Sequence, residues 1–363
     1  MQNILVLCWM FFVSVLGHME GMQRRENVLG KEARRATWTY ALIVMLPLIV
    51  LAVMRSNYFG DTPAYIDDYR SIPSFMSGKL DYIRAHTKDT GFYAMGALVS
   101  IFAGAHFKYF FLLIALVQGY ALIKLYRKHS EDYWLAIFVF VATTDYLSWM
   151  YNGIRQFFAV AVTLYAFEPI IRKQYIKAAV IIAFASLFHQ SALMMIPIMF
   201  IVQGRPWNWK TLLVIMGTVV AMSASGIFTD TLDSVLANTQ YRNVVSDWRG
   251  GGDDGSNPLR VLVYSVPTIL SLLCRDQIIK SKDRAARIAC NMGIMSTALY
   301  LVSMVTSGIY IGRLPIYCSL YANGILLPWE LKYAFGRSMR STAIVCYVLF
   351  YVSQLIFVWG FST

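Results

Sequence analysis

Charged residues are scarce in this sequence. Only 14% of its 363 residues are Asp, Glu, Lys or Arg, whereas a soluble domain carries about 25%. Hydrophobic residues make up 58% of the chain, and the mean hydropathy is +0.53. This composition excludes a water-soluble globule. It also excludes intrinsic disorder, because a disordered chain needs low hydrophobicity and high net charge.

Cysteine and the common metal-binding motifs are scarce as well. The five cysteines form no Cys-x-x-Cys pair, so neither a disulfide framework nor a structural zinc site is expected. The sequence contains no HExxH, DxD or P-loop motif. A metal-dependent nucleotide-sugar enzyme is therefore disfavoured, and we predict a protein with no cofactor and no metal site.

Long apolar runs recur from one end of the sequence to the other. Four of them cover residues 38–54, 133–149, 211–228 and 342–361. Each approaches or exceeds the roughly 18 residues that predict a membrane-spanning helix. We predict an all-α, polytopic transmembrane bundle of roughly 10–13 helical segments, folded as one integral membrane domain over residues 1–363.

The net charge of +12 fits this membrane class. Nucleic acid is not an expected partner, because no basic stripe with interleaved aromatic residues lies in a polar segment. Most basic residues instead gather in six short segments between apolar runs, where the positive-inside rule predicts cytoplasmic loops that contact the lipid bilayer. These segments are 24–35, 124–128, 172–177, 205–210, 275–287 and 332–340.

Two polar segments then fall on the extracytoplasmic side. They cover residues 55–90 and 229–258, and together they hold half of the 20 acidic residues. The N-terminal apolar run Ile4–Leu16 precedes its basic cluster instead of following one. We therefore interpret this run as a retained first helix with its N-terminus outside, and not as a cleaved signal peptide.

Two stretches do not fit a simple alternation of spans. Residues 91–123 hold two apolar runs where the charges allow one crossing, so we expect a half-embedded helix at 91–105 and then one full span. Residues 176–202 are too long for one helix and begin and end on the cytoplasmic side. We predict a hairpin there, broken near His189 and buried in protein or lining a cavity.

Four arginines lie on the side that the positive-inside rule disfavours. Each could reach lipid phosphates or pair with a nearby Asp, but four on one face favour a shared anionic ligand. A diphosphate fits, because a guanidinium binds two phosphate oxygens at once. The predicted diphosphate-binding residues are Arg55, Arg155, Arg242 and Arg313.

Two further residues are candidates for proton transfer. His189 lies in an apolar run, where a lone histidine is either a hydrogen-bonded core residue or a functional base. Asp61 follows Gly60 and either caps the next helix, orients Arg55 or accepts a proton from a sugar hydroxyl. These alternatives stay open from the residues alone.

Three segments resemble the signatures of the EpsG-like family of Wzy-type bacterial polysaccharide polymerases. They occur in the family's order within about residues 40–200: Arg55–Thr62 with Tyr65, Asn152–Gln156 with Ala159, and Leu187–Ala192. Asp89 departs from the pattern, because a Glu is expected before the Gly91-Phe92 pair. The shorter side chain keeps the charge but reduces the reach, so we leave Asp89 out of the predicted site.

This resemblance implies a metal-independent glycosyltransferase with a GT-C-like fold in the bacterial inner membrane, with its active site on the extracytoplasmic side. Its donor and acceptor would be oligosaccharide repeat units on undecaprenyl diphosphate, joined into a capsule or exopolysaccharide. A flippase and a chain-length regulator would act in the same pathway. The implied catalytic residues are His189, Asp61 and Arg155, and the implied sugar-binding residues are Asn152, Gln156 and Tyr65.

Other functions explain parts of the same pattern. A flippase or exporter of lipid-linked glycans would also use arginines, but along a path through the membrane, and would show internal repeats. A membrane acyltransferase would use His189 but would leave the four arginines without a role. A purely structural subunit would tolerate substitution of both Arg155 and His189.

Overall fold

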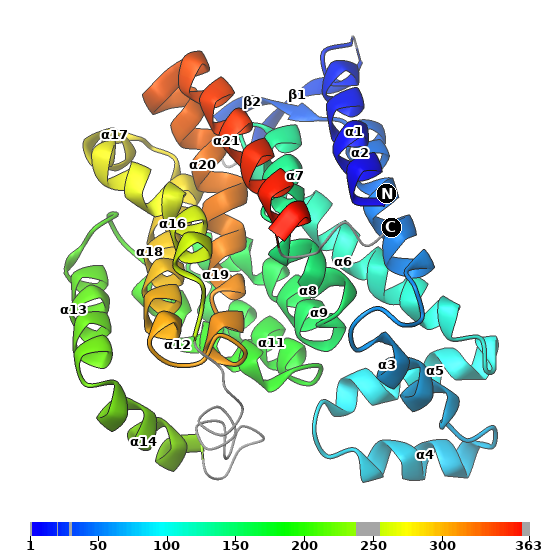
Figure 1. Cartoon of the computed structure of the whole chain (residues 1–363). Helices are drawn as coiled ribbons and strands as arrows, with labels where there is room; N and C mark the ends of the chain where they lie inside the picture. The colour runs from blue at the N-terminus through cyan, green and yellow to red at the C-terminus, as the bar shows by residue number, and fades with distance from the viewer. Residues whose placement is uncertain (1, 20, 29–30, 237–254, 358–363) are drawn as a thin grey trace. The chain divides into compact units, whose positions relative to one another are not determined.

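The computed structural model describes residues 2–19, 21–28, 31–236 and 255–357 (Figure 1). Helices dominate these ranges. Within them, four helices are long and apolar enough to cross a membrane, and shorter apolar helices accompany them. The four are Phe107–His129, Ile154–Ile171, Arg284–Met304 and Ile311–Phe357. The predicted all-α membrane class is therefore confirmed, while the GT-C-like architecture stays a prediction.

The chain divides into two compact units. Unit 1 comprises Met1–Ile196 and Ser341–Thr363, and unit 2 comprises Pro197–Arg340. A long, largely buried helix lies at the centre of each unit: α6 (Phe107–His129) in unit 1 and α18 (Arg284–Met304) in unit 2. One integral domain over residues 1–363 stays a prediction.

In unit 1, α6 packs against α2, α5 and α9. Its last turn is basic, which complements the partial negative charge at a helix C-terminus. The remaining helices of this unit are α1 (Gln2–Leu16), α2 (Trp38–Met54), α3 (Thr62–Arg70), α4 (Met76–Ala85), α5 (Thr90–Ala103), α7 (Tyr133–Ala142), α8 (Asp145–Tyr151), α9 (Ile154–Thr163), α10 (Phe167–Ile171), α11 (Tyr175–Ser186) and the larger part of α21 (Gly336–Phe357).

Helix starts in unit 1 follow local capping chemistry. The Thr37 hydroxyl accepts the N–H of Tyr40 at the start of α2. The Asp132 carboxylate accepts the N–H of Leu135 at 3.0 Å at the start of α7. Such caps satisfy N–H groups that have no partner within the helix, so the beginning of each apolar run is fixed by the residue before it.

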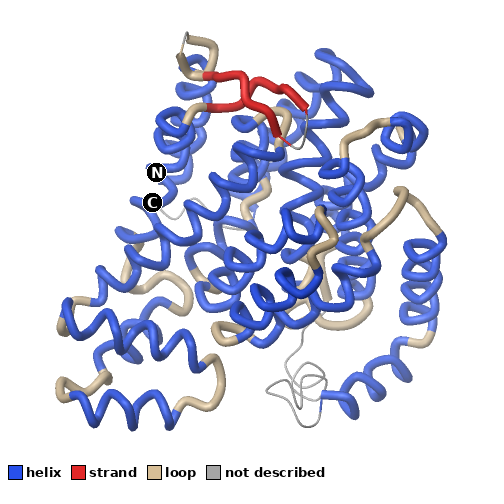
Figure 2. The backbone as a smooth tube through the Cα atoms, turned by 180° about the vertical axis from the view of Figure 1, so that it is seen from behind, coloured by secondary structure: helices blue, strands red, loops and turns tan. Residues whose placement is uncertain are grey.

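A β-hairpin occupies the first basic segment, where the sequence predicts only a loop. Strand β1 (Gln23–Val28) pairs antiparallel with β2 (Lys31–Ala36), with Gln23 opposite Ala36 (Figure 2). Arg127 of α6 binds both carboxylate oxygens of Glu26 at 2.8–3.0 Å. Arg35 pairs with Glu131 at 3.3 Å. The hairpin is thus attached to the C-terminal end of α6.

Two predicted helices are interrupted. The run 133–149 is not one helix, because α7 ends at Ala142 and α8 begins at Asp145. Between them Thr144 has a φ of +61°, a conformation that a β-branched residue adopts only under strong local constraint. The run 211–228 is interrupted at Ala224, where one helix ends and the next begins. Helical periodicity does not reveal such breaks.

The two irregular stretches follow the predicted boundaries. Within 91–123, α5 ends at Ala103 and α6 begins at Phe107, as expected. Within 176–202, α11 ends at Ser186, a 3₁₀ turn covers Gln190–Met194 and α12 (Met195–Ile201) follows. The predicted break near His189 is therefore confirmed, while the membrane depth of α5 and the hairpin path stay predictions.

In unit 2, α13, α16 and α19 pack around α18. The helices are α13 (Trp209–Ser223), α14 (Ser225–Leu236), α16 (Pro258–Leu273), α17 (Arg275–Lys280), α19 (Ile316–Tyr321) and α20 (Leu327–Glu330), with π turns at Ala322–Leu326 and Leu331–Phe335. The two polar segments predicted to be extracytoplasmic contain helix, with α3 and α4 in 55–90 and most of α14 in 229–258.

Candidate functional site

The first two motif segments are joined by one hydrogen bond in unit 1. The backbone N–H of Asp61 donates to Oδ1 of Asn152 at 2.5 Å. Gly60 has a φ of +52°, and a Cβ at this position would lie 2.1 Å from Asn152 Oδ1. Glycine is required at position 60 for two reasons: the backbone is left-handed, and the Asn152 side chain leaves no room for a Cβ.

Arg155 lies in the first turn of α9, one turn after Asn152. Its Nη1 makes two contacts. It donates a hydrogen bond to the Tyr93 hydroxyl at 3.2 Å and lies 3.4 Å from Asp89 Oδ2. The guanidinium carbon is 5.8 Å from the centre of the Tyr65 ring. The side chain is nevertheless 36% exposed, so the guanidinium is held in place and still accessible to a ligand.

Arg55 follows the last residue of α2 and ties three elements together. Its Nε donates to the Thr62 hydroxyl at 3.0 Å, Nη1 donates to the Ala52 carbonyl, and the guanidinium lies 4.0 Å from the centre of the Phe111 ring. The Tyr65 hydroxyl interacts electrostatically with both Arg55 and Arg155. Arg55 thus connects α2 and α3 to the N-terminal end of α6.

The third motif segment reaches the same region through the start of α5. The Gly91 N–H donates to the Leu187 carbonyl at 2.8 Å, and a Cβ on Gly91 would lie 2.9 Å from Leu187 Cβ. The Phe188 ring packs on Phe158 of α9 with centroids 4.7 Å apart. The three segments thus meet in unit 1. We call this region the motif cluster: Arg55, Asp61, Tyr65, Asp89, Asn152, Arg155 and His189.

A sequence profile of the EpsG family matches residues 38–363. The chain belongs to the EpsG family. This is a family of Wzy-like polymerases associated with glycosyltransferase-like activity, so the resemblance predicted from the three segments is confirmed. Searches of the curated proteins and of the solved structures found no match.

Asp89 of this EpsG-family chain belongs to the cluster, although sequence analysis left it out. Its side chain is only 6% exposed and pairs with Arg155. Asp89 has a φ of +52°, and its Oδ1 has no hydrogen-bond partner in the described part of the chain. Burial raises the pKa of this carboxyl, and Arg155 opposes the rise. The pairing spans 66 residues, so spacing alone does not reveal it.

An aromatic wall beside Arg155 was also missed. The His86 ring lies 3.8 Å from Tyr93 and 4.4 Å from Tyr82, measured between ring centres. The Tyr82 hydroxyl donates to the Asp68 carbonyl at 3.0 Å, and burial raises the pKa of Tyr82 to about 12. These rings form a flat face beside Arg155. Their only sequence signal was aromatic residues at the end of the polar segment 55–90 and at the start of the next apolar run.

The predicted proton acceptors have different surroundings. Asp61 precedes α3, but its carboxylate makes no capping hydrogen bond and the residue is exposed. His189 is partly buried, with Nδ1 2.7 Å from the Ser191 hydroxyl. Tyr65 and Gln156 are buried, and the Tyr65 ring lies beside the Arg155 guanidinium. The catalytic and sugar-binding roles stay predictions.

The other two predicted arginines do not belong to unit 1. Arg242 lies outside the described residues. Arg313 ends a 3₁₀ turn in unit 2 and is partly buried. The end of the polar segment 229–258 lies against the same turn, because Gly312 of that turn packs on the Ser256 hydroxyl. The Ser256 N–H also donates to the Ser303 carbonyl at 3.0 Å. Convergence of all four arginines stays a prediction.

Metal ligands do not cluster in the described ranges of this EpsG-family chain. No group of three or more His, Cys, Asp or Glu side chains is placed there to hold a metal ion. Metal independence stays a prediction.

Proposed function

We propose that this chain is a membrane glycosyltransferase of the bacterial inner membrane. It joins oligosaccharide repeat units carried on undecaprenyl diphosphate into a capsule or exopolysaccharide, at the extracytoplasmic face. The observation that carries this proposal is the meeting of three separate motif segments around Arg155. That arginine is fixed by Asp89 and Tyr93 but remains 36% exposed.

The proposed reaction is the attack of an acceptor sugar hydroxyl on the anomeric carbon of the donor. The new C–O bond forms as the bond to the lipid diphosphate breaks, and the bonding electrons leave on the diphosphate. Arg155 stabilises this charge. Arg55 is bound by its neighbours and serves mainly to hold α2, α3 and α6 together.

The hydroxyl proton passes to Asp61 or His189. Asp61 is supported by its exposed carboxylate, which is not used for helix capping. His189 is supported by its contact with Ser191, which fixes the orientation of the ring. Asn152 acts as a positioning residue for Asp61 through their 2.5 Å hydrogen bond. Tyr65 and Gln156 shape the sugar-binding wall.

The decisive experiment is reconstitution of the full chain in liposomes with a synthetic undecaprenyl-diphosphate repeat unit. A ladder of longer products, resolved by gel or mass spectrometry, is the expected result. Arg155→Lys should reduce the product by about 100-fold or more, because a point charge does not replace a bidentate fork. The variant should insert normally.

The matched control is Arg84→Lys. Arg84 lies in the polar segment 55–90 and is 77% exposed. Among the ion pairs of the described residues, it has one with the exposed Asp81 at 3.6 Å. Its substitution should leave the ladder unchanged. Movement of the lipid-linked glycan across the bilayer without elongation would contradict the proposal and favour a flippase.

A further inference from the structure

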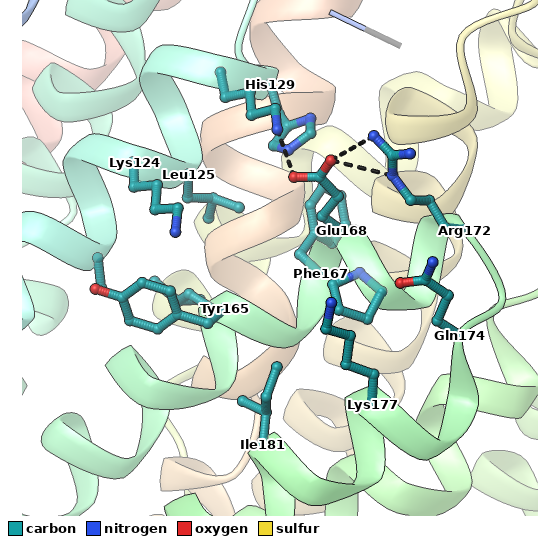
Figure 3. Close-up of a pocket in the computed structure, with 14 residues that line it drawn as sticks. Lys124, Leu125, His129, Tyr165, Phe167, Glu168, Arg172, Gln174, Lys177 and Ile181 are labelled. Atoms are coloured by element: carbon teal, nitrogen blue, oxygen red, sulfur yellow. Dashed lines mark hydrogen bonds and ion pairs between the residues drawn. The ribbon is translucent and has the colours of Figure 1, made fainter.

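A second cationic site lies at the other end of α6. It is a cavity of about 490 Å³ in unit 1, bordered by the last turns of α6, by α10 and by the beginning of α11. Four cationic side chains line it: Lys124, Lys128, Arg172 and Lys177. One carboxylate, Glu168, lines it as well (Figure 3).

The single carboxylate does not balance these cations. Glu168 Oε1 accepts hydrogen bonds from Arg172 at 2.8 and 3.1 Å, while Oε2 pairs with Lys128. The described residues place no carboxylate within 4.0 Å of Lys124 or Lys177. Lys124 Nζ lies over the Tyr165 ring, 4.8 Å from its centre, and Figure 3 shows Lys177 on the other side of the cavity. The cavity therefore has an excess of positive charge.

The cavity is separate from the motif cluster. Phe111, which lies under Arg55, and Lys124 are 13 residues apart on α6, which is about 20 Å along a helix. The four cationic residues of the cavity come from two of the six basic segments that the positive-inside rule assigns to the cytoplasm. The diphosphate site proposed above faces the opposite side of the membrane.

The surface beside the cavity is apolar. Ile176, Val180 and Phe184 are exposed and follow one another at four-residue intervals on α11, so they form one stripe of that helix. Lys177 and Ile181 of the same helix line the cavity. An anion that carries acyl chains would place its charged end between the cations and its chains along this stripe, whereas a free anion would leave the stripe uncovered.

We propose that this cavity binds the phosphate headgroup of an anionic phospholipid from the cytoplasmic leaflet. Lys124 and Lys177 contact the phosphate oxygens from the two walls. Arg172 and Lys128 hold Glu168 away from the ligand. This assignment is independent of the polymerase chemistry, because none of these residues belongs to the motif cluster.

The test measures lipid binding by the purified full chain. Native mass spectrometry and thermal unfolding would follow titration with phosphatidylglycerol and, separately, with phosphatidylcholine. We expect retained phosphatidylglycerol and a higher unfolding temperature, and neither effect with phosphatidylcholine. The double variant Lys124→Gln/Lys177→Gln should bind phosphatidylglycerol roughly 30-fold more weakly, from the loss of two cations near an anionic group.

Two further variants separate a site from general surface attraction. Lys280→Gln/Lys282→Gln removes two exposed lysines from another predicted cytoplasmic segment and should bind like the wild type. Lys124→Arg/Lys177→Arg keeps the charge and should retain binding. Equal weakening in both Gln double variants would overturn the proposal, and so would unchanged binding in Lys124→Gln/Lys177→Gln.

A free phosphate ion is the other source of the same chemistry. Inorganic phosphate at millimolar concentration, added without lipid, should leave the unfolding temperature unchanged. Stabilisation of the wild type by phosphate alone, lost in Lys124→Gln/Lys177→Gln, would overturn the lipid assignment. Stabilisation of the wild type by phosphatidylglycerol, without any stabilisation by phosphate alone, would support it.

Discussion

The two ends of α6 carry cationic side chains in two different arrangements. At the N-terminal end, Arg55 and Arg155 are bound by neighbours, through Thr62 and Phe111 in one case and Asp89 and Tyr93 in the other. At the C-terminal end, lysines predominate and the cavity between them is open. Fixed guanidinium forks favour recognition of one geometry, whereas flexible ammonium groups attract any nearby anion.

The two ends of α6 also differ in how far apart in the sequence their contacting residues lie. The motif cluster depends on contacts between distant residues, since Asp61 and Asn152 are 91 positions apart and Asp89 and Arg155 are 66 apart, so small changes in one segment displace another. All the residues that line the basic cavity lie between positions 121 and 181. Substitutions should therefore have large effects at the first end and small effects at the second.

After Arg155→Lys, the largest effect is expected for Asp89→Ala. Loss of the carboxylate that fixes Nη1 leaves Arg155 free to move, and a displacement of about 1 Å can cost roughly 100-fold in rate. Polymer formation in the reconstituted system should fall by that order, and Asp89→Glu should restore part of it. Asp81→Ala, at an exposed carboxylate of the same polar segment, should have no effect. Equal losses in both Ala variants would contradict the positioning role.

A smaller effect is expected for Gly60→Ala. Gly60 and Gly104 have φ values of +52° and +55°, but only Gly60 would bring a Cβ against Asn152, since nothing lies within 4 Å of that position at Gly104. Gly104→Ala should cost about 1 kcal/mol of unfolding free energy, and Gly60→Ala about 1–3 kcal/mol more. Thermal unfolding measures both. Identical shifts would show that the Asn152 contact contributes nothing.

The pH dependence of stability should reveal the buried Asp89. Because burial raises its pKa above 3.8, the folded state binds this proton more tightly than the unfolded state. The resulting stabilisation is complete below pH 3.8 and is lost as the pH rises through the raised folded value. Asp89→Asn should remove this dependence, worth about 1.4 kcal/mol per pKa unit. A constant difference in unfolding temperature between the two proteins across this range would argue against a raised pKa.

The smallest effect is expected at the other end of α6. Lys124→Gln/Lys177→Gln should leave polymer formation within about twofold and lipid-free stability within about 0.5 kcal/mol, since these side chains have no carboxylate partner in the described ranges. Activity assays in detergent and thermal unfolding would measure both. A large loss of polymer in detergent would mean that the two ends of α6 are coupled.

Much of the helical framework was predictable because it follows local chemistry. The apolar run 38–54 coincides with α2, whose start is set by Thr37, and the break near His189 follows from a run too long for one span. The EpsG family was recognisable from three short segments. What was not predictable depends on backbone strain or distant contacts, as at Thr144 and in the Asp89–Arg155 pair.

The β1–β2 hairpin can be joined to the C-terminal end of α6 only late in synthesis of the chain. Its two ion pairs join residues 101 and 96 positions apart, Glu26 to Arg127 and Arg35 to Glu131. At a translation rate of about 5–20 residues per second, roughly 5–20 seconds separate the emergence of each pair's two members from the ribosome. During that interval the first two helices enter the bilayer before these ion pairs exist. The ion pairs form only after α6 has been inserted.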